Sequence, residues 1–198
     1  MRFLMEPFKL ETRGEGDKKQ DVIVGYAAVF DKRSVELSDW AGKFVEEIAP
    51  GAFDGRLTDD VICCTNHDDN MLLGRNSSGT LRLSIDEIGL RYECDLPNTT
   101  AGRDIMEYIS RKDISGSSFR FKVKRDEWTS TDDDEIDLRR IMQFERLADV
   151  APVTFPAYHD TEVDVRSASR EEFITSRTAK TIQNNQAIRA RLALDAIK

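Results

Sequence analysis

The two histidines of this 198-residue chain, His67 and His159, are the side chains best suited to move a proton near neutral pH. His67 follows a short apolar run and is flanked by polar residues, so we expect it where a strand emerges into a loop. Ser118 opens another alternating apolar run. A serine beside a histidine can attack a carbonyl once the imidazole has taken the hydroxyl proton. Taken singly, such a histidine is usually solvated and such a serine is usually a turn residue, so the pair needs further support.

The cysteines and nearby acids offer weaker chemistry. Three cysteines, an odd count without framework spacing, indicate reduced thiols. A metal site would need donors on one side of the chain, but adjacent cysteines in a strand point to opposite faces. A Cys64 nucleophile next to His67 is no better, because residues three apart on an extended chain align poorly. We therefore expect neither metal nor cofactor from the candidate donors Cys63, Cys64, His67, Asp68 and Asp69.

Charge and hydropathy exclude several classes of function. The net charge of −8 disfavours nucleic-acid binding, which needs clustered cations. No apolar run is long enough for a membrane span, and the N-terminal stretch lacks a secretory apolar segment. We expect no nucleic-acid partner, no membrane association and a cytoplasmic location in the cell that makes the chain.

Hydrophobic periodicity indicates a mainly β (α+β) fold with hairpin connections. One helix is expected at 100–112, capped by Thr99 or Thr100, and 126–137 is expected to be an acidic loop. An antiparallel barrel or sandwich with added helices fits this order. Extended segments are expected at 21–30, 44–53, 61–65, 80–86, 89–96, 118–123 and 138–155.

From Ser167 the character of the chain changes. Residues 167–198 carry a net charge of +3, against −11 for residues 1–166, and their apolar positions are sparse. We predict a domain at 1–166 followed by a helical or flexible tail at 167–198. The tail is expected to deliver the protein to a partner or to be processed, and docking on its own domain or on a second subunit is the alternative.

An ordered set of motifs resembles the prohead protease family of tailed bacteriophages. The resemblance covers roughly residues 20–165, and its specificity lies in the order of the motifs rather than in any one of them. The motifs are GYAAVFD, FVEEIAPGAF, NHDDNMLLGRNSSGTLRL, GLRYECDLPNT, ISGSSFRF and LADVAPVTFPAYHDT.

The resemblance implies a serine endopeptidase with a fold related to the herpesvirus assembly proteases, an antiparallel β-barrel with peripheral helices. It implies cleavage of scaffold protein, of major capsid protein and of the chain itself inside the assembling prohead in the host cytoplasm. A homodimer or a higher oligomer is compatible with it. The alternative is a non-catalytic capsid assembly or scaffold-binding protein that kept the protease shell.

The resemblance also assigns site residues. The family histidine falls on His67 and the family serine on Ser118, although the adjacent Ser117 competes for that role. The third, imidazole-orienting position falls on Asp149, with His159 as the rival. Strand alternation places Asp149 on the same face as Leu147, so the acid would point into a site beside the core.

The sequence departs from the family pattern close to the serine. Arg120 stands where the usual pattern has glycine, which leaves the local backbone geometry and the oxyanion donors unassigned. Arg75 and Arg120 are the two candidate donors that the sequence offers.

Overall fold

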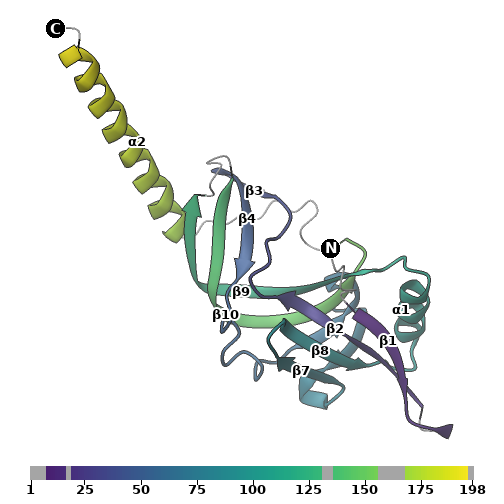
Figure 1. Ribbon diagram of the computed structural model, residues 1–198. Coiled ribbons are helices and arrows are strands. Elements are labelled where there is room, and N and C mark those ends of the chain that lie inside the picture. The colour runs from purple at the N-terminus through teal and green to yellow at the C-terminus, as the bar shows by residue number, and fades with distance from the viewer. Residues whose placement is uncertain (1–7, 17–18, 131–135, 156–167, 196–198) are drawn as a thin grey trace.

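The computed structural model describes residues 8–16, 19–130, 136–155 and 168–195, with side chains in the last range described for 169–189 and 191 (Figure 1). Its first sheet is antiparallel and has four strands in the order β1-β2-β8-β7. Burial alternates along most of β8, whereas β2 is buried without interruption from Val22 to Gly25, with Ile23 in the core between the sheets. The strands are β1 (Phe8–Arg13), β2 (Gln20–Val29), β7 (Leu81–Ile85) and β8 (Gly89–Asp95).

The second sheet is mixed. Its order is β3-β4-β10-β5-β6, and β9 pairs along β10 in a long antiparallel ladder. Strand β10 runs parallel to both β4 and β5, so the predicted antiparallel pairing is wrong for these two pairs. The strands described form two sheets and do not close into a barrel. The strands are β3 (Leu37–Asp39), β4 (Gly42–Ile48), β5 (Ile62–Cys64), β6 (Leu72–Arg75), β9 (Gly116–Ser130) and β10 (Asp137–Val153).

The main core lies between the two sheets. Apolar side chains from β2 and β8 meet those from β5, β9 and β10 in one buried cluster. Phe119 and Phe144 lie edge to face in it, with ring centroids 5.7 Å apart. This face of β9 is therefore committed to packing, and only the opposite face is free to carry polar chemistry.

Short helices connect the strands. Helix α1 (Thr100–Ser110) begins where the sequence predicts, and the Thr99 hydroxyl accepts a hydrogen bond from the Gly102 backbone N–H. Two single-turn 3₁₀ helices, η2 (Thr65–His67) and η3 (Asn76–Ser78), follow β5 and β6.

The first part of the predicted acidic loop, residues 126–130, belongs to strand β9. Strand β9 continues through Ser130, because Trp128 packs on Phe44 with ring centroids 5.2 Å apart. Asp126 is buried and accepts a 2.7 Å hydrogen bond from Arg139. Cross-strand packing and a buried ion pair thus override the polar composition of this segment.

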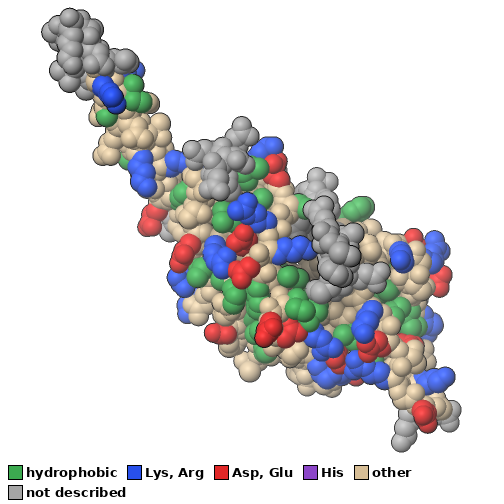
Figure 2. All heavy atoms as spheres, viewed as in Figure 1, with side chains coloured by type: hydrophobic (Ala, Val, Ile, Leu, Met, Phe, Trp, Pro, Cys, Tyr) green, Lys and Arg blue, Asp and Glu red, His purple; other side chains and the backbone are tan. Residues whose placement is uncertain are grey.

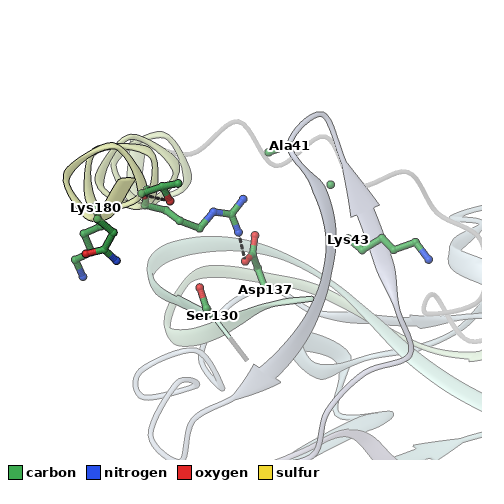
Figure 3. A pocket seen from close by; sticks show the side chains of 9 residues that line it. Ala41, Lys43, Ser130, Asp137 and Lys180 are labelled. Atoms are coloured by element: carbon green, nitrogen blue, oxygen red, sulfur yellow. Dashed lines mark hydrogen bonds and ion pairs between the residues drawn. The ribbon is translucent and has the colours of Figure 1, made fainter. Parts of the chain in front are cut away.

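Helix α2 (Ala168–Asp195) projects away from the sheets, and its first turns contact β9 and β10 (Figure 1). Arg170 is fully buried and pairs with Asp39 and Asp137. Its guanidinium lies 4.0 Å from the centre of the Trp128 ring, and Arg177 adds a second bond to Asp137. A polar cavity of about 530 Å³ adjoins this anchor (Figure 3). The domain boundary at 166 stays a prediction, but these contacts attach the start of α2 to the sheet.

Acidic and basic side chains are interspersed over the face of the molecule seen in Figure 2. Among the described residues, no helix is long and apolar enough to cross a membrane.

Candidate active site

A β-bulge in β10 decides where Asp149 points. Leu147 pairs with Phe121 of β9, and Asp149 pairs with Arg120, the residue next to Phe121. Strand β10 therefore advances by two residues where β9 advances by one. Leu147 lies in the core, and the extra residue, Ala148, turns Asp149 to the opposite face. The expectation that Asp149 and Leu147 share a face is wrong for this reason, and Asp149 instead lies on the polar side of β9.

His67 meets Asp149 on that face. Its Nδ1 lies 2.8 Å from Asp149 Oδ1, and the Asp149 side chain is fully buried. With the proton on Nδ1 donated to the carboxylate, the neutral ring leaves Nε2 free to accept a proton from another group. Residues 82 positions apart in the sequence thus form the histidine–carboxylate pair that acyl-transfer catalysis uses.

The turn that carries His67 is strained and tethered. Asn66 and His67 both have left-handed backbones, with φ of 54° and 58°, and asparagine is one of the few residues that tolerate this region. The Asn66 amide accepts a 2.8 Å bond from the Thr154 backbone N–H and donates one of 3.2 Å to the Thr154 hydroxyl. The side chain of Asn66 therefore holds η2 against the end of β10. Sequence reasoning did not assign a role to Asn66 or Thr154; the left-handed preference of asparagine was the available signal.

The two adjacent serines point to opposite sides of the sheet. Ser117 is directed to the core, where its hydroxyl lies 3.3 Å from the buried Tyr92 hydroxyl. Ser118 pairs with Ala151 and lies on the face of Asp149 and Arg120. Ser118 is 2% exposed, and the hydrogen bonds among the described residues do not include one from its Oγ to His67.

Arg120 contacts the same carboxylate as His67. Its backbone N–H donates to Asp149 Oδ1 at 3.1 Å, its Nε lies 3.0 Å from Oδ2, and its Nη2 binds Asp69 at 2.6 Å. The hydrogen bond to Asp69 is the main reason that the pKa of Arg120 is raised. Arg75, in contrast, is ion-paired with Asp60 on another strand edge. Both arginines thus have carboxylate partners already.

The thiol of Cys64 takes no part as a nucleophile in this arrangement. Burial, followed by the negative charge of Asp149, raises its pKa to about 12, so it is protonated at neutral pH. Donor atoms of Cys64, Asp69 and Asp149 lie within 4.8 Å of one another. The Arg120 guanidinium bonds to both acids, however, and already supplies the positive charge that a metal ion would bring.

A cavity of about 390 Å³ adjoins the His67 turn. Its walls combine apolar side chains, such as Met71 and Ile114, with polar ones, such as Asp68 and Asp113. The Thr65 hydroxyl at this cavity is buried and, among the described residues, has no hydrogen-bond partner. The lining residues are Thr65, Asn66, Asp68, Met71, Tyr108, Asp113, Ile114 and Thr154.

The rival third residue, His159, lies outside the described residues. The structure therefore brings Asp149 to His67 and gives no geometry for His159.

A family model described as caudovirus prohead serine protease matches residues 8–176 of the chain. No curated protein and no solved structure matches it significantly. The family match extends through the first turns of α2, the part of that helix that carries Arg170.

Proposed function

The chain belongs to the caudovirus prohead serine protease family, and from this premise we propose that it is an endopeptidase acting inside the immature capsid. Its substrates in this proposal are the scaffold protein, the major capsid protein and the chain itself. The observation that carries the proposal is the 2.8 Å contact between His67 Nδ1 and Asp149 Oδ1, on the sheet face that also bears Ser118.

The proposed catalytic group is Ser118, His67 and Asp149. Ser118 is a diagonal neighbour of Asp149 across the β9–β10 ladder. Two residues in such diagonal positions lie about 7–8 Å apart. One imidazole with a hydrogen bond at each nitrogen spans that separation. Hydrogen bonds of this kind are often long without substrate and shorten in the reactive complex.

The reaction follows from the free Nε2 of His67. This nitrogen takes the Ser118 Oγ proton as the oxygen attacks the scissile carbonyl carbon. The protonated ring then gives the proton to the leaving amine as the C–N bond breaks, which leaves an acyl-serine. A water molecule, deprotonated by the same nitrogen, then attacks the acyl carbon; the ester C–O bond breaks, the ring returns the proton to Ser118 Oγ, and the second product leaves as a carboxylic acid. Asp149 holds the tautomer with the proton on Nδ1 and stabilises the imidazolium.

The cavity beside the His67 turn supports a role in substrate recognition. It lies between η2, the end of α1 and the residues leading into β9, and Asn66 and Asp68 on either side of His67 line it. Its volume of about 390 Å³ suits one or two substrate side chains. We assign it to side chains of the bound peptide.

One observation favours a second candidate, a non-catalytic assembly or scaffold-binding protein. Ser118 is 2% exposed, so catalysis requires that substrate binding uncover it. A protein that had lost its activity would need no such movement.

An activity-based label separates the two functions. A fluorophosphonate should modify Ser118 covalently in the wild-type chain, with the site located by peptide mass spectrometry, and should not modify the His67→Gln variant. Co-expression with scaffold and capsid proteins should give their cleaved forms on a gel. A folded chain that is neither labelled nor able to cleave these proteins would support the assembly role.

A further inference from the structure

The carboxylate that orients His67 is bound by a permanent cation as well as by the histidine. Asp149 is fully buried, and both of its oxygens contact Arg120, one through the backbone N–H at 3.1 Å and the other through Nε at 3.0 Å. The guanidinium plane is fixed at its other end by Asp69. Arg120 thus determines both the rotamer and the net charge of the group that faces His67.

The charge of Arg120 acts on the proton of His67. An unpaired buried carboxylate would stabilise the imidazolium strongly, whereas a carboxylate already paired with a guanidinium does so less. The other charged or titratable groups around the ring are Cys64 on β5, the acids Asp68 and Asp69 that follow η2, and Asp113 across the neighbouring cavity. Of the groups named around His67, Arg120 is the one cation.

We propose that Arg120 is a positioning residue that fixes Asp149 for His67 and offsets the negative charge that the buried carboxylate presents to the imidazole. The proposal deepens the proposed function, since it concerns the same site. Arg120 lies two residues from Ser118 on the same face of β9, close enough to act on this site and half exposed. Solvent therefore screens part of its charge.

The sign of the effect follows from the charge removed. Replacing Arg120 with methionine deletes a positive charge beside the imidazole, which favours the protonated ring and raises the His67 pKa. The acid limb of the pH–activity profile should therefore move to higher pH, with a loss of kcat/KM of about tenfold on that limb.

Proton NMR measures this shift without any need for activity. The chain has two histidines, so the ring signals of His67 and His159 are assigned with one His159→Gln variant. Arg120→Met should raise the His67 pKa, and Arg120→Lys, which keeps the charge, should restore most of the wild-type value. Arg82→Met is the matched control, because Arg82 is also about half exposed and ion-paired, with Asp95 in the other sheet.

The outcomes are distinct. A folded Arg120→Met protein with an unchanged His67 pKa overturns the proposal. If that variant does not fold, Arg120→Gln, which retains a hydrogen-bond donor, carries the same expectation and the same refutation. Absence of proteolysis in every variant would count against the proposed function alone, because the NMR shift is read independently.

Discussion

The hydroxyl of Ser117 lies 3.3 Å from the hydroxyl of Tyr92 inside the core, while its neighbour Ser118 points to the other side of β9. Each serine therefore has a different environment. Ser117 contributes to the packing between the two sheets, and Ser118 shares its face with Asp149.

This difference predicts different outcomes for two alanine variants. Ser118→Ala should lower kcat by about 10⁴-fold or more and leave the unfolding midpoint unchanged. Ser117→Ala should keep most of the activity but lose about 0.5–1.5 kcal/mol of stability, the net value of one hydrogen bond. Gel assays of scaffold cleavage and thermal unfolding measure both. An active Ser118→Ala protein would place the nucleophile elsewhere.

Asp149→Asn tests the orienting residue. The amide cannot hold the same tautomer or stabilise an imidazolium, so kcat should fall by about 10³–10⁴-fold, a smaller loss than that from removing Ser118 or His67. His159→Ala is the comparison. Should it reduce turnover more than Asp149→Asn while stability is retained, the third role belongs to His159.

The bulge at Ala148 shows why the sequence could suggest candidate residues for this site but not their arrangement. Motifs pointed to His67, Ser118 and Asp149, and period-two alternation located most strands. Alternation fails at a bulge, however, since one extra residue reverses the face of all that follows. The parallel pairing of β10 with β4 and β5 was missed for a related reason, because periodicity carries no information about which strands become neighbours.

The Asn66 tether should matter for catalysis. Asn66→Ala removes both bonds to Thr154 and places alanine at a φ of 54°, so we expect a loss of about 1–3 kcal/mol in stability and about 10–100-fold in kcat. Asn66→Gly relieves the backbone strain and loses the same bonds, so it should recover stability more than activity. Thr154→Val keeps the 2.8 Å backbone bond and should be the mildest. Wild-type activity in all three variants would show that the tether does not position His67.

The cavity beside the His67 turn gives a prediction about substrate binding. Tyr108 lines it and is 42% exposed, so Tyr108→Ala should change stability by less than about 0.5 kcal/mol. We expect KM for a scaffold-derived peptide to rise several-fold with kcat little changed, because uniform binding contacts are lost. Ile88→Ala, at an exposed site in the β7–β8 turn, is the control. An unchanged KM would remove this cavity from the substrate path.

The last prediction concerns where α2 can be cut. Truncation at Arg166 would delete Arg170 and leave the carboxylates of Asp39 and Asp137 buried without their cation. Breaking a buried pair in this way costs about 3–5 kcal/mol, so this truncation should destabilise the whole domain. Truncation after Ala179 keeps Arg170, Phe173 and Arg177 and should leave the melting temperature and peptide cleavage intact.

The truncation after Ala179 thus isolates the role of the projecting part of α2. If that part delivers the protease, the 1–179 chain should cleave peptide normally and be poorly incorporated into proheads, as measured by immunoblot of purified particles. Full-length protein with Arg170→Met is the matched control: it should lose stability, because Asp39 and Asp137 lose their cation while α2 is retained. Normal incorporation of the 1–179 chain would refute a delivery role, since the deleted residues would then be dispensable for entry. Loss of stability on that truncation would instead show that residues beyond 179 belong to the fold, through the polar cavity that Lys180, Thr181 and Asn184 help to line.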